Sequence, residues 1–213
     1  MFYIRLDIVN KKEYEELNKD YKEIKISFPK DSEELEKDFE YLGLDYKNLS
    51  LQDTHIKECA IICEEDPDFS VNVTGRLNRL IAKASNQGYT TPFNDMKELY
   101  NLVYNIQHDD REKLLAILEA EEEKIINIKD VLKYVKNLDS FYLDWASLSN
   151  EEYAKNEIHL GELYMEDVLP YIDLETLGKD LIRNRKAILT DYGVLCRMDE
   201  GITNENEEEF GGE

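Results

Sequence analysis

Two short segments near the N-terminus alternate between apolar and polar residues. Residues 2–8 and 23–28 follow a period of two, which is typical of a strand with one buried face. Pro29 comes directly after the second segment and ends it. Residues 58–63 form an apolar run of strand length, which predicts a third, buried strand.

A helical period replaces the alternation between residues 31 and 41. Asp31 or Ser32 can cap this helix, and Gly43 is placed to end it. At ~100° per residue, the apolar side chains share one face and several acidic side chains share the opposite face. The apolar face holds Leu35, Phe39 and Leu42, and the acidic face holds Glu33, Glu36 and Glu40. The pattern predicts an amphipathic helix that exposes a stripe of carboxylates.

The middle of the chain, from residue 74 to residue 138, is helical in its pattern. Apolar residues recur there at spacings of three and four, and a loop containing Gly88 and Pro92 separates the first two helical segments. The apolar residues of the four segments are Leu77, Leu80, Ile81, Met96, Leu99, Val103, Ile106, Leu114, Leu115, Leu118, Val131, Leu132 and Val135. Together these segments predict a short helical bundle.

Short strands and helices alternate again in the C-terminal third. The pattern predicts a strand at 141–145, helices at 150–158 and near 164–172, and strands around 187–189 and 193–198. The polar, glutamate-rich end of the chain predicts a disordered tail.

We therefore expect an α+β fold in which an elongated chain of three small modules has two α/β-containing modules flanking a short helical bundle. The expected modules are an N-terminal α+β module at 1–70, a central helical module at 71–138 and a C-terminal α+β module at 139–201. An acidic tail follows at 202–213.

The charge of the chain narrows the possible partners. Its 213 residues include 48 acidic and 26 basic side chains, which gives a formal net charge of −22. Direct binding to nucleic acid or to an anionic membrane is disfavoured, because both require cationic surfaces. With three cysteines, no apolar run of membrane-spanning length and no signal-like N-terminus, we expect the protein in the cytoplasm.

The acidic residues are concentrated in two blocks. Residues 31–70 carry a net charge of −10 and residues 141–180 carry −8, whereas residues 71–100 carry +2. Solubility alone requires a net charge of only ~2–8 for a small domain, so the excess favours a basic partner surface such as a nucleic-acid channel. The carboxylates that we expect to contact this partner are Glu33, Glu36, Asp38, Glu40, Glu119, Glu121, Glu122, Glu123, Glu151, Glu152, Glu157, Glu162, Glu166 and Asp167. A solvated acidic face without a partner is the alternative that composition leaves open.

Motifs of known catalytic or metal sites are missing from the sequence. It has no glycine-rich phosphate loop, no Gly-x-Ser-x-Gly elbow and no His-Glu-x-x-His pair. His55, Cys59 and Cys63 are spaced by four in a predicted strand, where buried cysteines acting as small apolar residues are the better explanation. We expect no catalytic residue, no metal and no cofactor, and therefore no enzyme.

Several segments resemble ArdA-type antirestriction proteins, in the order in which that family has them. Tyr171–Leu181, followed by Thr190–Gly193, is similar to the C-terminal signature of the family. Ser27–Pro29 before an acidic helix resembles its first module, and Gly75–Leu80 resembles the start of its helical second module. The resemblance spans roughly residues 24–198.

The resemblance implies a dimeric DNA mimic that occupies the DNA-binding groove of type I restriction–modification enzymes. The signature implies an antirestriction motif associated with the dimer contact, at positions Tyr171, Asp173, Glu175, Gly178 and Asp180. The sequence departs from the family at Leu174, where an aromatic residue is common, and at Lys179, where arginine is usual. The central helical segment is also longer than in the family, and the glutamate-rich tail is an addition.

The hypothesis from the sequence is a non-catalytic inhibitor that presents distributed carboxylates as phosphate surrogates. Its homodimer contacts a type I restriction–modification enzyme, and it binds neither nucleic acid nor a membrane directly. Two alternatives remain open at this stage. One is an acidic DNA mimic directed at another DNA-binding machine, such as a CRISPR effector or a nucleoid protein. The other is a metal-dependent hydrolase that uses its carboxylates as ligands.

Overall fold

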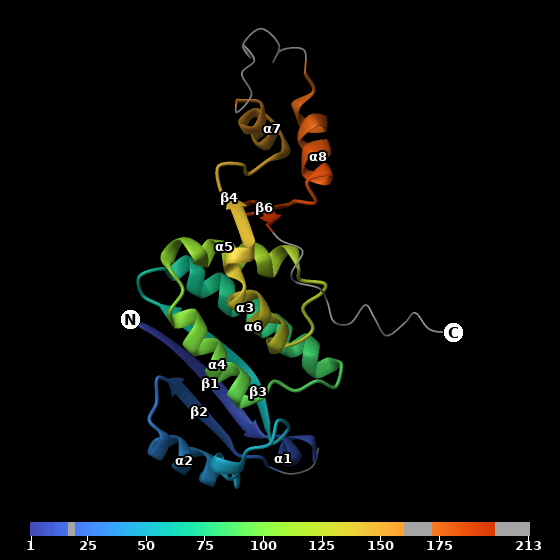
Figure 1. The fold of residues 1–213 in the computed structure, drawn as a ribbon. Helices are drawn as coiled ribbons and strands as arrows, with labels where there is room; N and C mark the ends of the chain where they lie inside the picture. The colour runs from blue at the N-terminus through green and yellow to red at the C-terminus, as the bar shows by residue number, and fades with distance from the viewer. Residues whose placement is uncertain (17–19, 160–171, 199–213) are drawn as a thin grey trace, which may run out of the picture. The chain divides into compact units, whose positions relative to one another are not determined.

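The computed structural model describes residues 1–16, 20–159 and 172–198. The chain divides into two compact units, Met1–Lys136 and Asn137–Glu213, and each unit is described by itself. Both combine helices with a three-stranded antiparallel sheet (Figure 1). The fold is therefore mixed α+β, as the sequence predicts.

The first unit is built on a sheet with strand order β2-β1-β3. Strand β1 (Phe2–Asn10) pairs antiparallel with both β2 (Glu23–Phe28) and β3 (Thr54–Cys63). The first two strands lie where the alternation predicts them. Strand β3 begins four residues before the predicted run, because pairing with β1 extends it back to Thr54. The short helix α1 (Lys11–Glu15) follows β1 directly, and the Asn10 side chain caps it.

One face of this sheet forms the core of the first unit. The buried residues on it are Ile4, Leu6, Ile8, Ile26, Phe28, Ile56, Cys59 and Ile61. Two helices cover this face, because the ring of Phe93 in α4 (Phe93–Tyr104) lies 5.4 Å from that of Phe28 and 4.8 Å from that of Phe39 in α2. Residues Arg5 and Asp7 occupy the opposite face, where one is exposed and the other is half-buried.

Helix α2 (Ser32–Tyr41) has the amphipathic character that the sequence predicts. The Asp31 carboxylate accepts a hydrogen bond from the backbone N–H of Glu34, 2.8 Å away, and caps the helix. Its apolar residues Leu35 and Phe39 are fully buried. Gly43 follows the end of the helix with φ of +72°, a left-handed conformation that glycine adopts without strain.

Helix α3 (Pro67–Asn86) is joined to the edge of β3 through its polar side chains. Ser70, Thr74 and Asn78 lie four residues apart along one face and accept hydrogen bonds of 2.7–2.9 Å from the backbone N–H groups of Cys63, Ile61 and Cys59. They thereby satisfy backbone groups that an open sheet edge would leave unpaired. The expected module boundary at 70/71 falls inside this helix. The first two expected modules thus form one unit, because α3 is part of the sheet's hydrogen-bond network.

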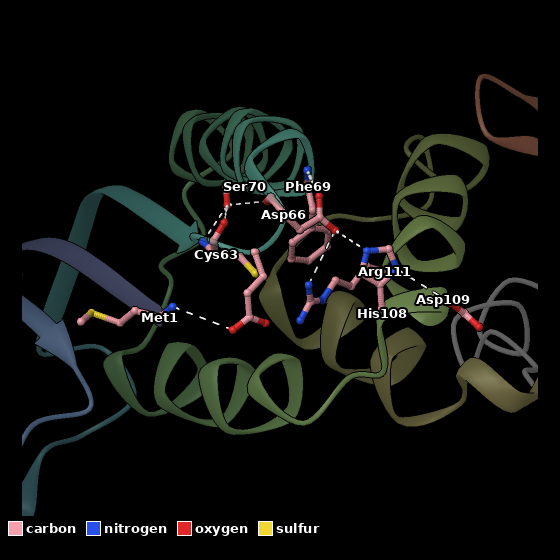
Figure 2. A network of polar contacts seen from close by, with 9 residues as sticks. Met1, Cys63, Asp66, Phe69, Ser70, His108, Asp109 and Arg111 are labelled. Atoms are coloured by element: carbon pink, nitrogen blue, oxygen red, sulfur yellow. Dashed lines mark hydrogen bonds and ion pairs between the residues drawn. The ribbon is translucent and has the colours of Figure 1, made fainter.

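Helices α3 and α5 (His108–Ala120) meet near their N-termini, where Figure 2 shows a polar network around Asp66. One Asp66 oxygen accepts from the backbone N–H of Phe69 at 2.9 Å and caps α3. The other lies 3.7 Å from a guanidinium nitrogen of Arg111 and 3.9 Å from an imidazole nitrogen of His108. The Arg111 guanidinium also lies over the Phe69 ring, so a single arginine links the two helices.

The remaining helix of the first unit, α6 (Ile128–Lys136), contacts both α4 and α5. The 3₁₀ turn η1 (Tyr46–Asn48) follows α2 and is capped by Asp45. The predicted helical segments of the central region are therefore present as α3, α4, α5 and α6. Their predicted apolar residues are buried, except for the half-buried Ile106, which lies beyond the end of α4.

The second unit contains a sheet with strand order β4-β6-β5 and two helices. After the turn η2 (Leu138–Ser140), the elements are β4 (Phe141–Asp144), α7 (Asn150–His159), α8 (Leu174–Asn184), β5 (Ile188–Thr190) and β6 (Gly193–Arg197). Tyr153, Ala187 and Val194 form a small buried core against which Leu181 and Leu189 pack. Helix α8 is absent from the predicted elements. The helix predicted near 164–172 and the predicted tail at 202–213 lie outside the described residues.

Candidate functional site

Helix α2 carries a dense group of exposed carboxylates. Glu33, Glu36 and Glu40 are all exposed on the side opposite the buried face, where the sequence places them. Glu36 pairs with the exposed Lys47 at 2.8 Å, and this contact raises the pKa of the lysine. Throughout the described residues, Glu33 and Glu40 form no ion pair or hydrogen bond through their carboxylates. Their charges are therefore open to an external partner.

In the structure, two further acidic residues are exposed on this surface, and one expected residue is half-buried. Asp31 and Glu34 are exposed at the start of the same helix, although neither belongs to the predicted stripe. Asp38 is half-buried and pairs with Lys30, so its charge is largely compensated. The 31–41 segment holds six acidic residues and one lysine, and this local excess is the signal that could have identified all of them.

The acidic run at 119–123 is only partly exposed, in contrast to the expectation. Glu121 is 4% exposed, lies 2.8 Å from the Lys124 ammonium and accepts a hydrogen bond from the Tyr134 hydroxyl at 3.4 Å. Glu119 pairs with Arg76 at 2.8 Å in a half-buried contact. Glu122 and Glu123 are exposed. The run therefore contributes two carboxylates to the surface, and the other two hold α5 to its neighbours.

The Glu121→Gln substitution is expected to act on folding alone. It removes a charge-assisted contact in a buried position and should lower the free energy of unfolding by about 1–3 kcal/mol. Glu123→Gln, at an exposed position of the same run, should stay within about 0.5 kcal/mol of the wild type. Chemical denaturation of the two variants measures both values. Equal stability of the two variants would contradict the buried contact at Glu121.

The acidic residues of α7 are mostly paired within the second unit. Glu151 lies 2.6 Å from the Lys155 ammonium, and Glu157 pairs with Arg185. Glu152 accepts a hydrogen bond from the backbone N–H of Leu148 at 2.9 Å and helps to begin the helix. The other expected surface residues of this region, Glu162, Glu166 and Asp167, lie outside the described residues. In the described part of this unit, the expected carboxylates are thus less available than those on α2.

The motif-like segment has a structural role in α8. Asp173 caps the helix and accepts from both the backbone N–H and the hydroxyl of Thr176, and these hydrogen bonds lower its pKa. Glu175 accepts from Lys179 and from the Asn150 side chain of α7, and these contacts lower its pKa. The expected motif position Tyr171 lies outside the described residues.

Of the other two described motif positions, Gly178 packs against α7 and Asp180 forms an ion pair within α8. Gly178 is buried, and a Cβ atom built on it would lie only 1.9 Å from the backbone oxygen of Asn150. Asp180 pairs with Arg183 one turn along the helix at 2.7 Å. Glu175 and Gly178 therefore contact α7, whereas Asp173 and Asp180 form their contacts within α8.

The cysteines and histidines do not assemble into a metal site in the described chain. No group of three or more His, Cys, Asp or Glu side chains there is placed to hold a metal ion. Cys59 and Cys63 are buried, unpaired thiols, and burial raises the pKa of Cys59 to about 12. Burial also lowers the pKa of His55, whose ring stacks on Tyr14 at 4.7 Å.

The described residues form a mixed α+β fold in which α2 exposes Glu33 and Glu40 without an ion pair and Glu36 paired with Lys47. None of the described helices is long and apolar enough to cross a membrane. The sequence matches no protein-family model and no curated protein.

Proposed function

We propose that the protein is a non-catalytic DNA mimic that occupies the DNA-binding groove of a type I restriction–modification enzyme. The observation that carries the proposal is the exposed row of carboxylates on α2, in a chain with a net charge of −22. The resemblance of several segments to ArdA-type antirestriction proteins supports the choice of target. The proposal places the protein in the cytoplasm, where such enzymes meet DNA.

The spacing of charges on α2 supports the use of carboxylates as phosphate surrogates. A helix rises 1.5 Å per residue, so Glu33 and Glu40 are separated by about 10 Å along the axis. One DNA strand carries about three phosphates over this length. Helix α2 presents Glu33, Glu36 and Glu40 over the same length, with Glu36 paired to Lys47, and the exposed Asp31 caps the start of the helix. A groove that accepts phosphates at this density can accept these carboxylates.

The proposal includes a homodimer, because one helix covers only a small part of a DNA-binding groove. Two copies of the chain double the number of acidic surfaces without a change in sequence. In this arrangement the exposed Glu122 and Glu123 add charge to the surface of the first unit. The α7 carboxylates contribute only where a basic partner competes with their present lysine and arginine contacts.

The test of the proposed function is DNA cleavage by a purified type I restriction–modification enzyme. We expect the protein to protect unmodified DNA at roughly stoichiometric concentration and to lose this protection as the salt concentration rises. The same titration with a CRISPR effector and with a nucleoid protein tests whether another DNA-binding machine is the target. Inhibition of only these two proteins would overturn the choice of target. Inhibition of none of the three would overturn DNA mimicry.

A further inference from the structure

A second candidate site, separate from the acidic surface, lies in a cavity of the first unit. The cavity has a volume of about 320 Å³ and is lined by the start of α1, the loops before α4 and the N-terminus of α6. This volume falls within the ~300–1,000 Å³ range of small-molecule sites. Residues from segments far apart in the sequence line it, including Lys11, Thr90, Asp95 and Lys129.

The carboxylate of Asp95 lines this cavity without a partner. Asp95 is 8% exposed, and its side chain forms no hydrogen bond or ion pair anywhere in the described chain. It occupies the third position of α4, where an acidic side chain commonly accepts from the N-cap backbone N–H. The N-cap of α4 is Pro92, which has no N–H to donate. The N-cap of α4 therefore supplies no hydrogen-bond donor to the Asp95 carboxylate.

A positive charge lies near the same cavity without an ion pair of its own. Lys129, in the first turn of α6, is exposed, and its ammonium forms no ion pair or hydrogen bond with the residues that the structure describes. Burial raises the pKa of Asp95, the charge of Lys129 lowers it, and the charge of Glu98 on the same helix raises it. The other lysine of the cavity, Lys11, already pairs with Glu15 at 3.6 Å.

The geometry points to a small zwitterion as the ligand of this cavity, with an ammonium group on Asp95 and an acidic group on Lys129. Asn127 and Ile128 at the start of α6 also line the cavity, but the backbone N–H groups there already donate to the side chains of Asn127 and Asp130, so Lys129 supplies the positive charge for the acidic group. A simple anion would leave Asp95 uncompensated and would be repelled by it. A simple cation would meet the same repulsion from Lys129.

Two classes of metabolite present this chemistry: free amino acids, with a carboxylate, and phosphorylated amines, with a phosphate. Calorimetric titration of the full chain with a panel of free amino acids and with O-phosphoethanolamine distinguishes them. We expect saturable binding of at least one zwitterion in the millimolar range or below. Matched compounds that lack either the ammonium or the acidic group should bind at least tenfold more weakly. Failure of every zwitterion to bind at millimolar concentration would overturn the proposal.

Matched variants assign the binding to this cavity. Asp95→Asn and Lys129→Gln should each weaken binding at least tenfold. Asp68→Asn, also in the first turn of a helix, and Lys37→Gln on α2 change the same charges elsewhere and should leave binding unchanged. Unaltered affinity in Asp95→Asn would overturn the assignment. Because this site shares no residue with the acidic row on α2, its failure would leave the proposed function unaffected.

The melting temperature of Asp95→Asn separates loss of the ligand contact from loss of the fold, because a disrupted fold would melt at a lower temperature. The raised pKa of Asp95 means that the folded chain holds its proton more tightly than the unfolded chain does. Wild-type stability should therefore fall, relative to the variant, as the pH rises from the ordinary carboxyl range through the raised pKa. Asp95→Asn should melt at an equal or higher temperature than the wild type at neutral pH without ligand. A lower melting temperature would mean that Asp95 has a stabilising partner.

Discussion

Simultaneous replacement of Glu33, Glu36 and Glu40 by glutamine should weaken competition with DNA by about tenfold or more. Each exposed carboxylate contributes about 0.2–1 kcal/mol to a contact with a basic groove, so the effects become large only in combination. A single replacement should change the inhibitory concentration by no more than about fivefold. Titration of each variant against the same enzyme–DNA complex measures these shifts.

The control for this experiment has the same net charge but an intact row on α2. Asp68→Asn, Asp109→Asn and Glu112→Gln together remove three exposed charges from the starts of α3 and α5. This variant should compete nearly as well as the wild type. Equal losses in both triple variants would show that only the total charge matters. Loss of function from one α2 replacement, with the fold preserved, would contradict distributed mimicry.

The Gly178→Ala substitution should lower the free energy of unfolding of the second unit by about 3 kcal/mol or more. The added Cβ would lie 1.9 Å from the backbone oxygen of Asn150, so α8 cannot keep its present distance from α7. Backbone atoms cannot rotate away as the end of a flexible side chain can. Amide hydrogen exchange should therefore show lost protection in α7, α8 and the β4-β6-β5 sheet, with the first unit unchanged.

Gly75→Ala is the matched control in the first unit. Gly75 lies inside α3, and its nearest neighbour beyond the helix backbone would be an Arg79 nitrogen at 3.8 Å, an ordinary contact. Alanine is the better helix former by about 0.5–1 kcal/mol, so this variant should be more stable than the wild type. A loss of stability in Gly178→Ala together with a gain in Gly75→Ala would confirm the close approach at Gly178. A stable Gly178→Ala variant with normal exchange would contradict it.

The sequence predicts an element well where the residues of that segment alone decide which of its sides is buried. Helix α2 is the clearest case, because its period separates Leu35 and Phe39 from Glu33 and Glu40 without reference to the rest of the chain. Helix α8 has local signals of its own, since Asp173 caps it and its apolar residues share one face, but the close approach of Gly178 to Asn150 depends on a residue far away in sequence. The same limit applies to sites. Burial of Glu121 requires Tyr134, and the cavity at Asp95 requires α1, α4 and α6 together.

The central claim is that this chain takes the place of DNA in a basic groove. Release of labelled DNA from a purified type I methyltransferase complex tests it most directly, in a titration repeated over a series of salt concentrations. We expect full release at low micromolar protein or below, with an affinity that falls steeply as salt rises. No release at any salt, with complexes from several type I subfamilies, would contradict the account.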